Sequence, residues 1–148
     1  MQEKVKQYVR DRVVGNEKVL DIGSLDVNGS LKDLFTDYIG LDMREGANVD
    51  VVANAHKLPY KKETFDLVTC AETLEHDDNP FKTLDEIYRV LKPGGKVLLA
   101  ASGISFPKHD YPSDYFRYTA EGMGALLHRF KNIETADDND EAYGSAIK

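Results

Sequence analysis

Short apolar segments of strand length alternate along this chain with segments of helical periodicity, and this alternation constrains the fold more than any other feature of the sequence. Alternating elements of this kind build parallel sheets whose faces are covered by helices. The predicted strands are 18–23, 38–42, 49–52, 65–70 and 96–101, with weaker candidates at 131–136 and 142–147. We therefore predict an α/β fold with helices on both faces of one sheet.

The helical segments carry recognisable start signals. An Asn-Pro pair places an N-cap residue before a proline at the first helical position, and a threonine caps another segment. Helices are predicted over residues 1–14, from Gly29 and Ser30 onward, from Asn79 and Pro80 to Leu91, and from Thr119 to Phe130. The chain has 148 residues, the size of one ordinary domain, so we predict a single domain over residues 1–148.

Composition excludes several classes of function. The formal net charge is −7, with 19 Lys and Arg against 26 Asp and Glu, so we expect no DNA partner, although an RNA substrate with a local basic patch stays open. The single cysteine, Cys70, rules out a disulfide within the chain and a cysteine metal cluster. No apolar run is long enough to span a membrane, and the charged segment 1–12 lacks a signal-peptide pattern, so we expect a cytoplasmic protein.

The residues that follow the first predicted strand suit a ligand loop. In open parallel sheets, ligands bind outside the carboxyl ends of the strands. Asp21, Gly23 and Ser24 lie at this end, and small residues there let the backbone approach a ligand. The dinucleotide pattern G-x-G-x-x-G would require glycine where the chain has Leu25, which argues against a nicotinamide or flavin cofactor. A plain strand-to-helix turn remains the alternative interpretation.

The second predicted strand ends in an acidic residue, Asp42. A carboxylate roughly 20 residues beyond the first glycine turn is placed to bind the ribose hydroxyls of an adenosine cofactor. The alternative is a solvated aspartate at a strand end. The position of Asp42 after the Gly23 turn favours the ribose interpretation.

Taken together, five segments resemble the class I S-adenosylmethionine-dependent methyltransferases of the broad type-11 group. They occur in the order and spacing of that family, from about residue 18 to residue 101: VLDIGS (19–24), YIGLD (38–42), DVVANAHKLPY (50–60), FDLVTCAETLEH (65–76) and IYRVLKPGGKVL (87–98). The resemblance implies S-adenosylmethionine as cofactor. It also implies a Rossmann-like, seven-stranded, mostly parallel sheet whose last strand is antiparallel.

The same resemblance implies roles for residues at matching positions. The first-strand loop would hold the methionine part of the cofactor, the acid after the second strand would bind ribose, and later segments would read adenine and line the methionine and acceptor side. The implied cofactor-binding residues are Asp21, Gly23, Ser24, Asp42, Met43, Asn54, Ala55 and Ala71, and Glu72 would line the substrate side. Two departures from the family pattern are Leu25 in place of glycine and Asn54 in place of aspartate.

Methyl transfer from a sulfonium is an in-line displacement in which the cofactor carries the reactivity and the protein supplies positioning and sometimes a base. The candidate bases are His76, His109 and Asp110, with Glu72 as a further candidate whose alternative role is only to bound the pocket. For His76, a structural role in a loop or helix cap is the alternative. Because each histidine stands apart in the sequence and the acids are scattered, we predict no metal site.

The loop 102–118 is dense in aromatic residues with charged groups between them. Aromatic side chains with hydroxyls suit sugars and ring-bearing substrates, so we expect a small-molecule or glycan-type acceptor. Tyr111, Tyr115 and Arg117 are predicted to face or seal the pocket. The alternative is that the aromatic residues pack over the sheet while Arg117 pairs with Asp114.

Two rival functions remain open from the sequence. The chain could be a catalytically silent relative that binds the cofactor or serves as a partner subunit. It could also be a nicotinamide-dependent oxidoreductase, which Leu25 argues against.

Overall fold

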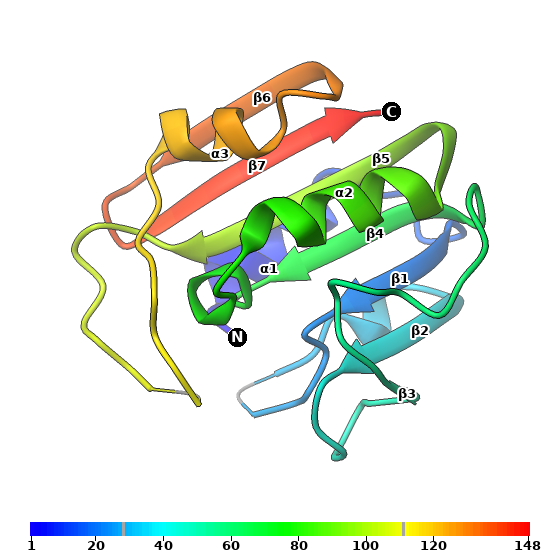
Figure 1. Ribbon diagram of the computed structural model, residues 1–148, viewed down its shortest axis with the longest axis horizontal. Coiled ribbons are helices and arrows are strands. Elements are labelled where there is room, and N and C mark those ends of the chain that lie inside the picture. The colour runs from blue at the N-terminus through cyan, green and yellow to red at the C-terminus, as the bar shows by residue number, and fades with distance from the viewer. Residues whose placement is uncertain (28, 111) are drawn as a thin grey trace.

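The computed structural model describes residues 1–27, 29–110 and 112–148 as a mixed sheet flanked by helices (Figure 1). Within these residues the sheet has seven strands in the order β3-β2-β1-β4-β5-β7-β6. The strands are β1 Lys18–Ile22, β2 Asp37–Asp42, β3 Val51–Val52, β4 Phe65–Ala71, β5 Leu91–Ser102, β6 Lys131–Asp137 and β7 Glu141–Ile147. Strands β1 to β5 pair in parallel, whereas β7 is antiparallel to both β5 and β6. The predicted fold, including the antiparallel last strand, is confirmed.

Helices cover both faces of the sheet. Helix α1 (Glu3–Arg10) lies on one face, and α2 (Pro80–Val90) and α3 (Ala120–Leu126) lie on the other (Figure 1). Side chains of the central strands alternate between the two faces, as the pleat requires. The cluster under α2 and α3 includes Leu20, Val68, Val97, Ile87 and Met123; the cluster under α1 includes Val5, Val9, Val19, Leu67 and Leu98.

Most of the expected start signals act as predicted. The Thr119 hydroxyl accepts the backbone N–H of Gly122 at 3.1 Å, and Pro80 is the first residue of α2. Asn79 occupies the N-cap position of α2 without a side-chain capping bond. Helix α2 ends at Val90, and the backbone is extended from Leu91 into β5.

The helix predicted from Gly29 is wrong in extent. Only a 3-10 turn, Lys32–Leu34, forms there, although Leu31 is fully buried under α1 as an apolar face would require. The segment between β1 and β2 is short, and a brief helix gains too few hydrogen bonds to offset the entropy of nucleation. A second 3-10 turn, Leu74–His76, follows β4.

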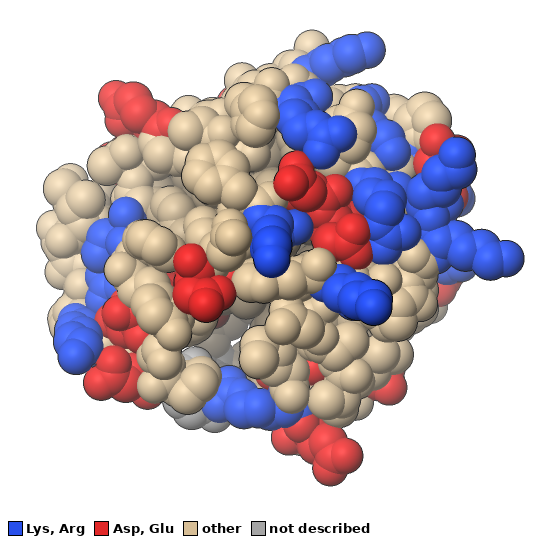
Figure 2. Space-filling view, in the orientation of Figure 1, with Lys and Arg blue, Asp and Glu red and all other residues tan. Residues whose placement is uncertain are grey.

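On the face that carries α2 and α3, Lys and Arg side chains gather toward the right of the view, with Asp and Glu side chains among them (Figure 2). Within the described residues, no helix is long and apolar enough to cross a membrane. Because β1 to β5 run in parallel, their carboxyl ends meet at one edge of the sheet. The loops that leave this edge build the candidate site.

Candidate functional site

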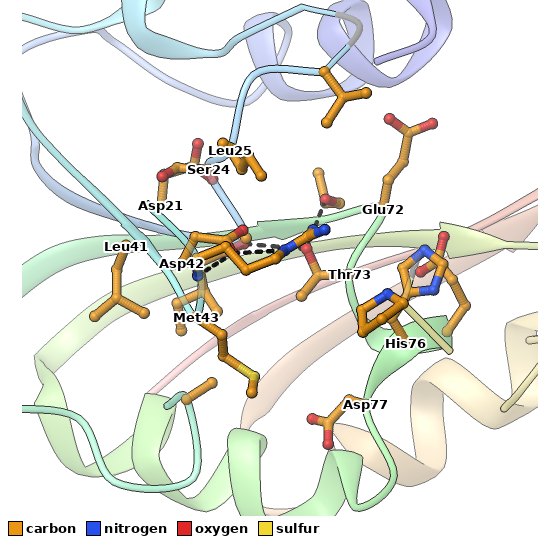
Figure 3. A pocket seen from close by; sticks show the side chains of 18 of the residues that line it. Asp21, Ser24, Leu25, Leu41, Asp42, Met43, Glu72, Thr73, His76 and Asp77 are labelled. Atoms are coloured by element: carbon orange, nitrogen blue, oxygen red, sulfur yellow. Dashed lines mark hydrogen bonds and ion pairs between the residues drawn. The ribbon is translucent and has the colours of Figure 1, made fainter. Parts of the chain in front are cut away.

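A cavity of about 860 Å³ opens at the carboxyl ends of β1, β2 and β4. Its volume is in the range typical of small-molecule sites. Thirteen of the residues predicted for the site line it: Asp21, Gly23, Ser24, Asp42, Met43, Asn54, Ala55, Ala71, Glu72, His76, His109, Asp110 and Tyr115. Figure 3 shows Asp42 and Met43 on one side of this cavity and Glu72 and His76 on the other. Tyr111 lies outside the described residues.

The turn after β1 requires glycine at position 23. The φ angle of Gly23 is +79°, and a Cβ atom there would lie 1.8 Å from the Thr73 Oγ1 atom. The Thr73 hydroxyl itself donates to the backbone oxygen of Ala71 at 3.0 Å, which holds it in place against the turn. Glycine is therefore required at position 23 for two reasons: the left-handed backbone conformation and the close approach of the loop that carries Thr73.

A buried polar network shapes the same turn from below. One carboxylate oxygen of Asp21 accepts the Tyr38 hydroxyl at 2.6 Å, and the other accepts the Thr69 hydroxyl at 2.7 Å. The side-chain amide of Asn48 donates to both the Tyr38 hydroxyl and the backbone oxygen of Ser24, at 2.8 and 3.0 Å. Burial raises the pKa of Asp21 to about 6, with the nearby charge of Asp42 acting in the same direction. Both Asp21 oxygens are thus engaged with the protein, so its direct effect is on the shape of the loop.

The end of β2 presents a carboxylate beside an exposed thioether. The Asp42 side chain is 12% exposed, and its Oδ1 atom accepts the backbone N–H of Arg44 at 3.0 Å. A carboxylate has about four acceptor positions, so this bond leaves capacity for ligand hydroxyls. Met43 is 68% exposed in the isolated chain and lines the cavity directly after Asp42. The pair offers hydrogen-bond acceptors and an apolar surface for a flat ring.

Leu25, the departure from the family pattern, is accommodated by a second glycine. A Cβ atom on Gly46 would lie 2.3 Å from the Leu25 Cδ1 atom, so the leucine packs over the bare backbone at position 46. The leucine remains part of the cavity lining. The loop after β2 therefore takes up the extra side chain.

The segment after β3 is held by short polar contacts. The Asn54 Oδ1 atom accepts the backbone N–H of His56 at 2.8 Å, and Ala55 packs against the core cluster under α2 and α3. The His56 Nε2 atom lies 2.6 Å from the Asp77 Oδ1 atom, which joins this segment to the loop after β4. The sequence offered no signal for the contact between His56 and Asp77, because it joins two separate loops.

The side of the cavity opposite Asp42 and Met43 is formed after β4 by Glu72, Glu75 and His76. Glu72 has a φ angle of +52°, a strained value for a non-glycine residue. Glu75 is fully buried, and its Oε1 atom accepts the Ser102 hydroxyl at 2.9 Å. Burial raises the pKa of Glu75. Glu75 was not predicted as a site residue, although it stands in the same LEH segment as His76.

The fold brings together two histidines that are distant in the sequence. The rings of His76 and His109 are perpendicular, with centroids 4.8 Å apart. The His109 Nε2 atom lies 3.9 Å from the Glu75 Oε1 atom. Asp110 also lines the cavity, and its carboxylate is 3.7 Å from the Lys108 ammonium.

Arg117, predicted to face or seal the cavity, is not among the residues that line it. Its guanidinium pairs with both carboxylate oxygens of Asp114 and donates to the backbone oxygens of Phe106 and Pro107. The Arg117 charge holds the pKa of Asp114 well below its usual range. The alternative role, in which Arg117 pairs with Asp114 and orders the loop, is the one the structure shows. Residue type alone could not separate the two roles.

Backbone contacts place the rest of the loop 102–118 against the site. The backbone N–H of Tyr115 donates to the backbone oxygen of Glu75 at 2.7 Å, and the buried Tyr118 hydroxyl donates to the backbone oxygen of Leu74 at 3.0 Å. The Tyr115 side chain is 52% exposed and lines the cavity. The loop is therefore tied to the 3-10 turn after β4 and carries Tyr115 at the rim.

Several residues that shape the site were missed from the sequence. Thr69 had a local signal, because it is the polar residue inside the otherwise apolar end of a predicted strand. Tyr38, Asn48 and Thr73 had none, since their importance depends on contacts between segments. The missed residues share one property, which is that they contact predicted site residues from a different loop or strand.

Comparison with known proteins identifies the relatives of this chain. A family model described as a methyltransferase domain matches residues 20–99, which confirms the resemblance found in the sequence. A ubiquinone/menaquinone biosynthesis C-methyltransferase from Hydrogenovibrio crunogenus is 43% identical over 83 residues, which cover 54% of this chain and 33% of that protein. The match thus spans about a third of the length of this curated relative.

Solved structures share the fold. A SAM-dependent methyltransferase from Thermotoga maritima superposes with a TM-score of 0.79 at 19% identity, covering 97% of this chain and 87% of that chain. The 1,6-didemethyltoxoflavin-N1-methyltransferase from Burkholderia thailandensis, solved with its substrate and S-adenosylhomocysteine, gives a TM-score of 0.76 at 15% identity and covers 98% of this chain and 76% of that chain. At these identities the likeness extends to the fold.

Proposed function

Because this chain belongs to the methyltransferase-domain family, we propose that it transfers the methyl group of S-adenosylmethionine to a small-molecule or glycan-type acceptor. The observation that carries the proposal is a single cavity with two chemically distinct sides. The end of β2 offers a carboxylate and an exposed thioether, and the loops after β4 and β5 offer histidines and Tyr115. The first side suits an adenosine, and the second suits an acceptor.

The residues present fit the cofactor. Asp42 keeps acceptor capacity for the ribose hydroxyls, and Met43 supplies an apolar surface for adenine. The Gly23 turn has no side chain, so the methionine part can lie close to its backbone. Asn54 accepts a backbone N–H through its amide oxygen, which has a second lone pair for the adenine amino group. Leu25 is turned over Gly46, which limits its effect on this side of the cavity.

The cofactor supplies an activated methyl group on a sulfonium. Held at the Gly23 turn and by Asp42 and Met43, it would supply that methyl group for an in-line displacement by the acceptor atom. The protein aligns the two reactants and excludes water from between them. When the acceptor is a hydroxyl or an amine, its proton passes to a group on the acceptor side, for which His76, His109 and Asp110 are the candidates.

Calorimetry with S-adenosylhomocysteine and NADH, followed by a radiolabelled methyl-transfer screen, tests the proposal. The acceptor panel contains sugars, phenols, amines and a quinol, the last because of the printed name of the sequence relative. We expect S-adenosylhomocysteine to bind and NADH not to bind. Binding of NADH alone would overturn the proposal in favour of an oxidoreductase. Cofactor binding with no methylated product across the panel would favour the catalytically silent relative.

Tyr115→Ala tests the acceptor side separately. Tyr115 lines the cavity on the loop after β5, which a backbone hydrogen bond ties to Glu75. We expect the variant to raise the KM for the acceptor or lower kcat while the cofactor affinity stays within about twofold. Phe116→Ala, at a neighbouring exposed aromatic that does not line the cavity, is the matched control. Equal loss of turnover in both variants would show that the loop acts only through stability.

A further inference from the structure

Three potential metal ligands converge where the sequence predicted no metal. One ligand atom each from Glu75, His76 and His109 lies within 4.8 Å of the others. All three residues line the cavity, on the side formed after β4 and β5. Two imidazoles and one carboxylate are a common ligand set of zinc sites that keep an open position for water or substrate.

The hydrogen bonds of the two rings prepare one nitrogen of each for a metal. The His76 Nδ1 atom lies 2.5 Å from the backbone oxygen of Ser113, and the His109 Nδ1 atom lies 3.1 Å from the backbone oxygen of Pro107. A carbonyl oxygen can only accept, so in the neutral ring each Nδ1 atom carries the proton and leaves the Nε2 lone pair for a metal. Metal-binding histidines are oriented in this way, with the other ring N–H donated to a carbonyl or carboxylate.

Glu75 adds an independent indication of a cation. Its side chain is fully buried, and its Oε2 atom is buried without a hydrogen-bond partner among the described residues. A buried carboxylate oxygen that lacks a hydrogen-bond partner is unfavourable when the group is charged. The Oε1 atom is fixed by the Ser102 hydroxyl and lies 3.9 Å from the His109 Nε2 atom. A divalent cation between these groups would compensate the charge.

We propose that Glu75, His76 and His109 form a Zn²⁺ site with an open coordination position toward the cavity. Ligand atoms around tetrahedral zinc are separated by about 3.3 Å, so atoms that now lie within 4.8 Å of one another need to approach by up to about 1.5 Å. Glu75 and His76 are adjacent on the 3-10 turn Leu74–His76, and His109 is in the loop after β5. The His109 side chain is 35% exposed, so a small shift of its loop, which also carries Pro107, can bring the Nε2 atom closer while the Nδ1 bond is kept.

A second cluster, His56, Asp77 and Asp78, is less suited to a metal. The His56 Nε2 atom already lies 2.6 Å from the Asp77 Oδ1 atom, and the other Asp77 oxygen accepts the Thr83 hydroxyl at 2.5 Å. Its polar atoms are engaged with one another, and Asp78 is exposed. This cluster therefore serves as the comparison in the test.

The proposed zinc site is independent of the proposed function, because it is inferred from the positions of the ligand atoms and not from methyl transfer. It does bear on the acceptor side of that function, since an oxygen or nitrogen atom of the acceptor could take the open position. As zinc ligands, His76 and His109 could not also act as bases. Asp110 would then remain of the three candidates.

The test uses the chain purified without a histidine tag and stripped of metal with a chelator. Zn²⁺ is titrated by calorimetry, and Co²⁺ is titrated in its place to report the coordination geometry by visible absorption. Glu75→Gln, His76→Ala and His109→Ala remove the ligands one at a time. His128→Ala is the matched control, because His128 is exposed on the surface after α3 and lies outside both clusters. Asp77→Asn probes the competing cluster.

We expect one Zn²⁺ per chain, a tetrahedral Co²⁺ spectrum, and at least ~100-fold weaker binding in each ligand variant. His128→Ala and Asp77→Asn should bind within about twofold of the native chain. Circular dichroism and S-adenosylhomocysteine affinity of the metal-free variants verify that they are folded, and Glu75→Gln keeps the size of the buried side chain. Unchanged Zn²⁺ affinity in Glu75→Gln and His109→Ala, or loss of binding in Asp77→Asn alone, would overturn the proposal.

Discussion

The substitution Glu141→Gln should change how the stability of this protein depends on pH. Glu141 is the first residue of β7 and is fully buried. Its Oε1 atom accepts the Gln2 side-chain amide at 3.0 Å, while its Oε2 atom has no hydrogen-bond partner among the described residues. Burial, together with the charges of Glu72 and Glu75, raises the pKa of Glu141 from 4.5 to about 8.

The sign of the effect follows from this direction. Because the pKa of Glu141 is higher in the folded than in the unfolded chain, the folded state binds the proton more tightly. The stability that this group contributes is fully present below pH 4.5 and is lost as the pH rises through 8. Linkage over this window gives a loss of about 3 kcal/mol in the free energy of unfolding between roughly pH 5.5 and pH 8.5. Glutamine keeps the acceptor for Gln2 and cannot ionise, so the variant avoids this loss.

Urea denaturation of both proteins at the two pH values measures the difference. The change in unfolding free energy with pH is compared between native chain and variant, which cancels groups common to both, such as Asp21. Glu134→Gln, on the exposed strand β6, controls for the change in net charge. If Glu141→Gln and the native chain lose the same stability between the two pH values, the reasoning about this buried carboxyl is refuted.

Three further predictions concern the site and its loops. Asp42→Ala should weaken cofactor binding by about 1–3 kcal/mol in calorimetry, because ribose hydroxyls lose their acceptor, whereas Asp37→Ala at the opposite end of β2 should not; equal affinities would remove the ribose assignment. Gly23→Ala should lower the free energy of unfolding by about 2–4 kcal/mol and impair cofactor binding, because a Cβ atom would meet the Thr73 hydroxyl, whereas Gly124→Ala in α3, with nothing within 4 Å, should stabilise by about 0.5–1 kcal/mol in the same denaturation assay. Arg117→Ala should lower the melting temperature, consistent with a loss of about 1–3 kcal/mol from its ion-paired hydrogen bonds, and leave cofactor affinity unchanged; a selective loss of turnover without loss of stability would restore its role in substrate binding.

Much of the cofactor side could be read from the sequence because its signals are local. Each signal lies at the end of one predicted strand, a glycine turn after the first and an acid after the second, and parallel strands bring their carboxyl ends to one edge. Gly23 and Asp42 were predicted on this basis, Met43 and Asn54 through the family resemblance, and all four line the cavity.

The acceptor side was less predictable because its contacts join loops after different strands. His76 and His109 were each recognised as chemically capable, but no spacing in the sequence indicated that their rings would be neighbours. The sequence allowed two roles for Arg117, in the pocket or in an ion pair with Asp114, and only the loop geometry places Asp114 against its guanidinium. Such choices depend on the path of a whole loop rather than on residue type.

The sequence by itself therefore determined the order of the strands, the α/β class of the fold and the family that the chain resembles. The strand order and fold class follow from periodicity, which acts over a few positions, and the family follows from five short segments in a fixed order. Only the tertiary structure decided that Thr73 closes against Gly23, that Leu25 packs over Gly46, and that Glu75 lies buried beside two histidines. The physical reason is that these contacts arise where separate loops converge, and convergence is set by sheet register and packing rather than by any local pattern.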